Sequence, residues 1–142
     1  MPILNYTTSI SVEKSMGEVI GALTRRGVTR ISTLFSDEGA PSGVAFTMKT
    51  DYGFREFELP VRVDGVLKAM TADTKVPRSQ CNRQQAARVA WRIAKDWLAA
   101  QSALIDAELA SLDEVMLPYM IDNKGRTAYS IMREGAMKEL DS

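Results

Sequence analysis

The chain has 142 residues, in which 18 Lys and Arg balance 18 Asp and Glu, with one cysteine and no histidine. The absence of histidine excludes Ser-His-Asp and Cys-His catalysis and His-bearing zinc sites, and one cysteine supplies neither a cysteine-only zinc site nor an internal disulfide. A net charge of zero provides no global attraction to nucleic acid or anionic lipid, so electrostatic recognition requires a local patch. We therefore expect a non-enzymatic protein without a metal or a cofactor.

The length predicts a single α+β domain over residues 1–142, because a chain of this size can bury a core of its own. We divide it into a half of strands and helices over 1–70, a basic loop over 71–82 and a helical half over 82–142. The start of the chain lacks a signal-peptide pattern, and no stretch approaches the ~20 apolar residues of a membrane span. We expect a protein that stays in the cytoplasm and out of the membrane.

The first half predicts a strand, a helix and three more strands. Residues 7–10 have the pattern of a short strand, and Ser11 then caps a helix that ends near Gly27. Alternating apolar residues predict the remaining strands, over 28–35, around Val44 to Met48 and around Phe57 to Val61. This order predicts a four-stranded, mainly antiparallel sheet with helices packed on one face.

Two glycines, Gly17 and Gly21, lie one turn apart inside the first predicted helix. Each costs up to ~1 kcal/mol relative to alanine in a helix interior. Their spacing indicates that another backbone approaches this side of the helix closely.

The helical half contains a long apolar-periodic segment over 82–117, which begins at a good N-cap residue, Asn82. Ser111 and Glu114 have the spacing of a capping box, so the segment either continues as one helix or restarts there as a second. A last, weaker helix is expected over about 127–140, with Ala128, Ile131 and Met132 able to pack.

The charges of this region are ordered against the helix dipole. Residues 68–95 contain seven bases and one acid, whereas residues 96–123 contain six acids and no base. A helix prefers acids in its first turn and bases in its last, by roughly 0.3–1 kcal/mol each. This order indicates that something other than local helix stability placed the charges.

One explanation is an anion or nucleic-acid site at the basic start of the long helix. Unpaired N–H groups and arginines there would attract phosphate, and an exposed tryptophan would stack on bases. The alternative is that the arginines form ordinary surface pairs and that the tryptophan belongs to the core. The candidate residues are Lys75, Arg78, Arg83, Arg88, Trp91, Arg92 and Lys95.

A second explanation is a homodimer. If two copies pack the long helix antiparallel, the basic half of one lies beside the acidic half of the other. One apolar stripe would then form the seam, unless it covers the chain's own elements. The seam candidates are Leu98, Ile105, Leu109 and Leu112.

The segments AWRIAKDWLAAQ, over 90–101, and LDEVMLPY, over 112–119, form a recurrent signature. With the opening Tyr6-Thr7-Thr8, they resemble a family of small uncharacterised proteins of bacteriophages, prophages and other mobile elements. The resemblance spans residues 6–120 and implies the cytoplasm of an infected or lysogenic bacterial cell. It implies no activity and no catalytic residue.

Three functions remain open from the sequence. The first is binding of nucleic acid, such as single-stranded DNA, or of another phosphate-bearing partner, in phage replication or recombination. The second is a dimeric protein-interaction module, such as an inhibitor of a host defence protein. The third is sequestration of a nucleotide signal, which would use the same arginines in a closed pocket.

Overall fold

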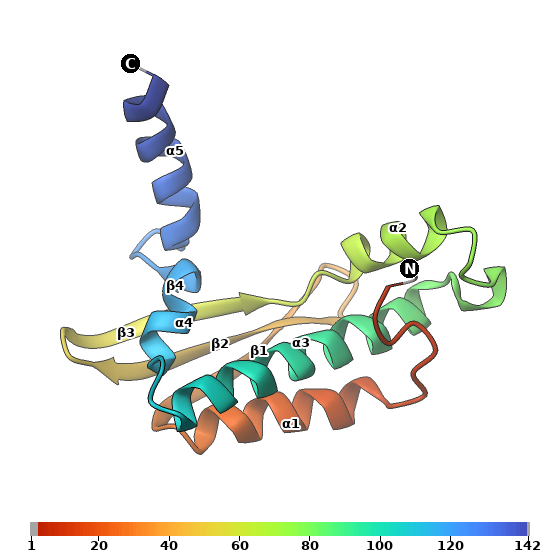
Figure 1. Cartoon of the computed structure of the whole chain (residues 1–142), viewed down its shortest axis with the longest axis horizontal. Helices are drawn as coiled ribbons and strands as arrows, with labels where there is room; N and C mark the ends of the chain where they lie inside the picture. The colour runs from red at the N-terminus through yellow and green to blue at the C-terminus, as the bar shows by residue number, and fades with distance from the viewer. Residues whose placement is uncertain (1–2, 142) are drawn as a thin grey trace.

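A four-stranded antiparallel sheet forms the base of the molecule, and helices cover one of its faces (Figure 1). The computed structural model describes residues 3–141, with side chains as far as residue 135. The expected α+β class and the four-stranded antiparallel sheet are confirmed.

The strands follow one another in the sheet as they do in the sequence. They are β1 (Val28–Phe35), β2 (Pro41–Thr50), β3 (Gly53–Pro60) and β4 (Met120–Ile121), in the order β1-β2-β3-β4. Every neighbouring pair is antiparallel. The three long strands therefore form a meander, and β4 from the C-terminal region adds a short edge strand beside β3.

The register aligns apolar residues on the covered face. Phe46 of β2 lies opposite Ile31 of β1 and opposite Phe57 of β3. The rings of Phe46 and Phe57 stack with their centroids 5.2 Å apart. Alternation along each strand explains why these residues share the face that the helices cover.

The predicted strand over 7–10 is not formed, and the fourth strand is β4 instead. The free edge of β3 pairs with Met120 and Ile121 from the other half of the chain. The carbonyls of Tyr6 and Thr8 instead accept hydrogen bonds from the Gln85 side-chain amide, at 3.0 and 2.9 Å. Local strand propensity was a poor guide here because it does not say which segment reaches the sheet edge.

Two helices lie side by side over the sheet, α1 (Val12–Thr24) and α3 (Arg83–Asp106) (Figure 1). Both predicted N-caps are present: Ser11 Oγ accepts from Lys14 N at 3.1 Å, and Asn82 Oδ1 accepts from Gln85 N at 2.8 Å. Their buried apolar residues join those of β2 and β3 in one core.

A shorter helix, α2 (Val63–Ala72), packs against the beginning of α3. The predicted basic loop follows it and contains one turn of 3-10 helix, η1 (Arg78–Gln80). A second, smaller core lies under this loop and consists of Met70, Val76, Ala86 and Val89. The loop is thus anchored to α3 by apolar contacts.

The expected close approach at the α1 glycines is wrong. A Cβ atom built on Gly17 meets no heavy atom within 4 Å, and one on Gly21 meets only the Arg25 guanidinium, at 3.5 Å. The close contact lies at Gly43 in β2, where a Cβ atom would come 2.7 Å from the Leu59 carbonyl oxygen. Both α1 glycines face an open groove between α1 and α3, so the sheet does not explain them.

The long periodic segment forms two helices. Helix α3 ends at Asp106, and α4 (Leu112–Met116) begins with the predicted capping box of Ser111 and Glu114. A 3-10 turn, η2 (Leu117–Tyr119), then leads into β4.

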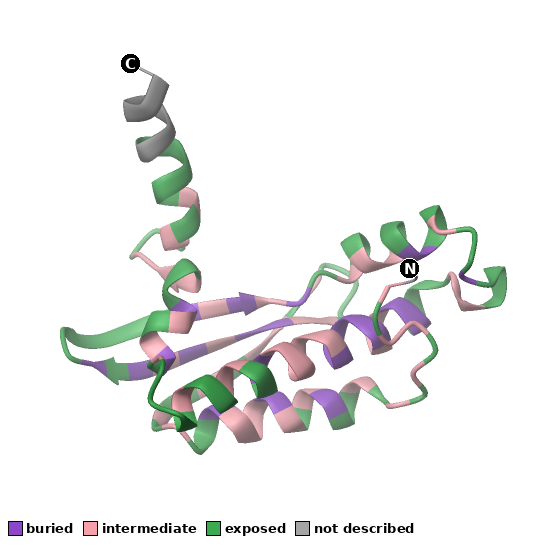
Figure 2. Cartoon of the chain, in the orientation of Figure 1, coloured by how far each residue is buried: buried purple, intermediate pink, exposed green. Residues whose placement is uncertain are grey.

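The last helix, α5 (Ala128–Asp141), stands away from the rest of the chain (Figures 1 and 2). Its contacts with the body are mainly with η2. The expectation that Ile131 and Met132 pack is wrong within this chain, because 39% and 62% of these residues are exposed.

Candidate functional site

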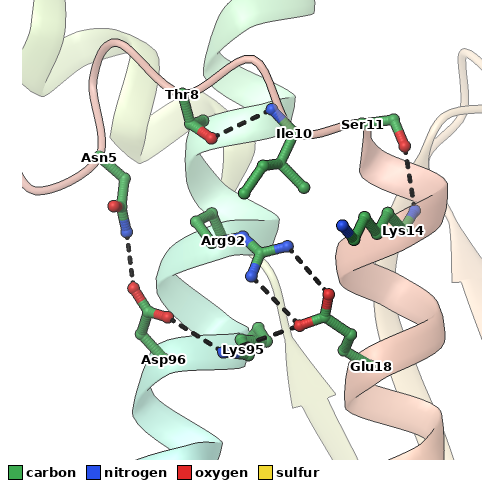
Figure 3. Close-up of polar contacts among 9 residues, drawn as sticks. All are labelled: Asn5, Thr8, Ile10, Ser11, Lys14, Glu18, Arg92, Lys95 and Asp96. Atoms are coloured by element: carbon green, nitrogen blue, oxygen red, sulfur yellow. Dashed lines mark hydrogen bonds and ion pairs between the residues drawn. The ribbon is translucent and has the colours of Figure 1, made fainter.

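Arg92 and Lys95, two of the expected anion-binding residues, bind a carboxylate of their own chain (Figure 3). Arg92 is only 7% exposed, and its Nη1 and Nη2 donate to the two oxygens of Glu18 at 3.2 and 3.4 Å. Lys95 Nζ lies 3.7 Å from Glu18 and 3.7 Å from Asp96. Through Glu18, both bases therefore link α3 to α1.

The electrostatics of Glu18 agree with this role. The hydrogen bond from Arg92 holds the pKa of the Glu18 carboxyl below its ordinary value, and the charges of Arg92 and Lys95 act in the same direction. Desolvation opposes this shift without reversing it. The Nε of Arg92 and the Oγ of Ser15 are buried without a hydrogen-bond partner in the described structure.

Arg83 also pairs within the chain. Its Nη1 lies 2.5 Å from Asp64 Oδ1 at the start of α2 and 4.0 Å from Glu38 Oε2 in the β1–β2 turn. The hydrogen bond to Asp64 raises the pKa of Arg83, and the charges of Asp64 and Glu38 contribute further. The first turn of α3 thus receives its negative charge from two neighbouring elements.

Arg88 has a different partner. Its Nη1 donates to the side-chain oxygen of Gln85 at 3.0 Å, and the amide of Gln85 holds the carbonyls of Tyr6 and Thr8. Arg88 therefore supports the N-terminal segment and is bonded to no carboxylate among the described residues.

Trp91 offers no surface for base stacking, so this part of the expected anion site is wrong. Its side chain is fully buried, and its indole Nε1 donates to the Pro41 carbonyl at 3.2 Å. Its periodicity in α3 was compatible with a core residue, and burial of the whole ring decides between the two interpretations.

Two members of the expected site stay exposed without a carboxylate partner among the described residues, and both lie in the loop that follows α2. Lys75 and Arg78 are exposed and have no carboxylate within 4.0 Å among the described residues, and neither do Arg62 and Lys68. The structure therefore divides the expected seven-residue site. Four members are paired with carboxylates or buried, namely Arg83, Trp91, Arg92 and Lys95. Arg88 bonds to Gln85, and Lys75 and Arg78 remain exposed at one end of the molecule.

The four seam candidates do not form one exposed stripe. Leu98 and Leu112 are 1% and 5% exposed and belong to the core of their own chain. Ile105 is half-buried against the same core, whereas Leu109 is 74% exposed. A seam through all four residues is therefore wrong, because Leu98 and Leu112 are already buried in the core of their own chain.

A well-bonded turn sets the direction of α5. One oxygen of Asp122 accepts from the N–H groups of Lys124 and Arg126, each at 2.9 Å, and the other accepts from Arg126 Nε at 2.9 Å. These bonds hold the pKa of the Asp122 carboxyl below its ordinary value, and the backbone bond from Arg126 has the largest effect. Gly125 adopts a φ of 76°, which glycine accepts readily. The spacing of Asp122 and Arg126, four residues apart, is the feature of the sequence from which this pair could have been predicted.

The turn directs α5, which exposes several apolar side chains, away from the body. The described part of α5 is mostly exposed (Figure 2). Tyr129, Ile131 and Met132 of this helix are 60%, 39% and 62% exposed. An isolated antiparallel β-bridge joins Ile121 and Thr127, the residues on either side of the turn. We call the segment 128–141 the arm.

A cavity of about 450 Å³ lies where β3 leads into α2. It opens to solvent and is lined by the β1–β2 turn, by the junction of β3 with α2, and by the first turns of α3. Arg83 and its two carboxylate partners lie at its rim.

Comparisons with known proteins find no matching family model, no matching curated protein and no matching solved structure. Among the described residues, no group of three or more Cys, Asp or Glu could hold a metal ion. In the same part of the chain, every helix is too short or too polar to cross a membrane.

Proposed function

We propose that this chain is a homodimeric protein-interaction module that assembles through its C-terminal arm. The observation that carries the proposal is the exposure of Tyr129, Ile131 and Met132 on a helix that the body does not cover. The signature of residues 90–101 and 112–119 supports a phage or prophage setting, in which such a dimer acts by holding a host or phage protein through surface contact.

The low stability expected of an isolated helix of this length indicates that the arm packs against a partner. A helix of 14 residues is marginal by itself in water, and most helices gain their stability from packing of an apolar face. The Asp122 turn keeps the arm from folding back onto its own body without loss of several hydrogen bonds. The apolar face therefore needs cover from another molecule.

The arm has features that suit a second copy of itself. Gly135 lies inside the helix, and a Cβ atom there would meet no heavy atom of the described chain within 4 Å. A glycine at this place permits close approach of another helix at the cost of helix propensity. In an antiparallel pair centred near Arg133 and Glu134, the arginine of each copy lies beside the glutamate of the other, so the charges are self-complementary.

The test is the mass of the protein in solution, measured by sedimentation equilibrium. We expect a dimer for the unchanged chain and a monomer for Ile131→Glu with Met132→Glu, because each arm would then bury charges in the pair. The matched control is Leu109→Glu, a substitution at a leucine outside the arm that is 74% exposed, which should leave the dimer intact.

Charge reversal makes the test specific for an antiparallel pair. Arg133→Glu and Glu134→Arg should each weaken the dimer, and the double variant should restore it, because the pattern is again self-complementary. A monomeric wild-type chain, or a dimer that the arm variants do not affect, would contradict the proposal.

A second function, binding of nucleic acid, is favoured by one observation. Lys68, Lys75 and Arg78 are exposed around the end of α2, without a carboxylate partner among the described residues. We propose Lys75 and Arg78, which belong to the site expected from the sequence, together with the neighbouring Lys68, as the binding surface, in which Arg92 and Trp91 take no part.

Binding of a labelled single-stranded oligonucleotide across a salt series tests this second function. Affinity should fall with salt, since phosphate contacts release counterions, and Lys75→Ala with Arg78→Ala should reduce both affinity and the salt slope. Lys49→Ala, at an exposed base in β2, is the control. Binding that is absent at low salt or indifferent to salt would refute it.

A further inference from the structure

The cavity at the α2 end of the molecule has apolar walls. Ala40 and Pro41 come from the β1–β2 connection, Val61 and Val63 from the β3–α2 junction, and Ala87 from α3. Its volume of about 450 Å³ is within the range of small-molecule sites, roughly 300–1,000 Å³. No aromatic residue is among the described residues that line it, so its walls suit an aliphatic group better than a stacked ring.

The rim carries two guanidinium groups with unused donors. A guanidinium has five N–H donors. Arg83 uses one of them in its hydrogen bond to Asp64, and its contact with Glu38 is long, at 4.0 Å. Arg62, also on the rim, has no hydrogen-bond partner or carboxylate within the described residues. The rim can thus receive an anionic group above an apolar space.

We propose that this cavity binds an aliphatic carboxylate, with its chain between Pro41, Val61 and Ala87 and its carboxylate at Arg62 and Arg83. Guanidinium groups match the planar, two-oxygen geometry of a carboxylate. The ligand's carboxylate replaces the loose contact of Glu38 with Arg83, whereas Asp64 keeps its bond and holds the guanidinium in place. The site is independent of the arm and of the proposed dimer.

The charges at the rim favour a monoanion over a dianion. Glu38 and Asp64 offset Arg62 and Arg83, so the net charge of these four side chains is close to zero, and a single added negative charge is tolerated. A phosphate dianion would meet the same two acids at close range and is therefore disfavoured.

Titration of octanoate and decanoate into the full chain, followed by amide chemical shifts, tests the proposal. We expect saturable shifts in residues 36–42, 61–65 and 83–87, with the longer chain binding more tightly. Arg62→Gln and Arg83→Gln should each weaken binding by about tenfold, as loss of one charged hydrogen bond does. Lys68→Gln, on α2 but outside the cavity, should change it by less than about twofold.

A second variant separates the cavity from the rim. Ala87→Leu fills the apolar space and should abolish binding while both arginines remain, and the thermal midpoint of each variant verifies that it is folded. Octylamine binding as tightly as octanoate, or a nucleoside monophosphate binding more tightly, would overturn the proposal, as would the absence of any saturable shift with decanoate. Each of these outcomes leaves the dimer test unaffected.

Discussion

Arg92 on α3 and Glu18 on α1 form a two-bond ion pair, with nitrogen to oxygen distances of 3.2 and 3.4 Å (Figure 3). The pair links helices that are 74 residues apart in the sequence. It accounts for one of the bases gathered in the first half of α3, because the compensating charge comes from the neighbouring helix. Packing of α3 against α1 therefore explains part of the concentration of bases in α3.

Acid should weaken this link. The pKa of Glu18 is lowered below 4.5 in the folded protein, so the unfolded chain binds a proton at a higher pH than the folded chain. The stability that the pair contributes is fully present above about pH 4.5 and is lost as the pH falls through the lowered pKa. The thermal midpoint should fall less at low pH in Glu18→Gln than in the unchanged chain. Glu13→Gln, a substitution at an exposed acid of the same helix, should leave this fall unchanged.

We expect the fluorescence of Trp91 to be unaffected by nucleic acid. In a Trp97→Phe background, its fluorescence should resist quenching by acrylamide because the ring is fully buried. Addition of single-stranded oligonucleotide should leave the emission unchanged. Strong quenching by either reagent would show that the ring is accessible and would restore the stacking interpretation.

The two leucines Leu98 and Leu109 should respond very differently to truncation. Leu98→Ala removes a side chain from the core at 1% exposure and should cost about 2–5 kcal/mol of unfolding free energy. Leu109→Ala changes a side chain that is 74% exposed and should stay within about 0.5 kcal/mol. Urea unfolding measures both, and equal effects would contradict the burial of α3 described above.

Glycine substitutions distinguish open space from close contact. Gly17→Ala should raise the unfolding free energy by up to ~1 kcal/mol, because the added methyl group meets nothing and alanine favours helix. Gly43→Ala should lower it by about 1–3 kcal/mol, since the methyl group would come 2.7 Å from a backbone oxygen of β3. A destabilised Gly17→Ala variant would indicate that another molecule covers the groove.

Much of the fold was readable from local patterns. The α1 helix with its Ser11 cap, the start of α3 at Asn82 and the capping box at Ser111 depend on residues within one or two turns of each other, and all are present. The strand over 7–10 was wrong because its competitor for the sheet edge, Met120–Ile121, lies more than 100 residues away. Local propensity contains no information about that competition.

The candidate site was less predictable for the same reason. The bases from Arg83 to Lys95 were found from the sequence, but their partners are long-range. Asp64 precedes Arg83 by 19 residues and Glu18 precedes Arg92 by 74. Whether a base faces solvent or a carboxylate depends on which elements pack together.

The sequence by itself determined the α+β class, the helix boundaries set by side-chain caps and the absence of histidine chemistry, because these follow from composition and from neighbours along the chain. Only the tertiary structure decided that Trp91 is buried, that Glu18 neutralises Arg92 and that the arm is left uncovered. Those outcomes depend on contacts between distant segments, which exist only after the sheet and helices have packed.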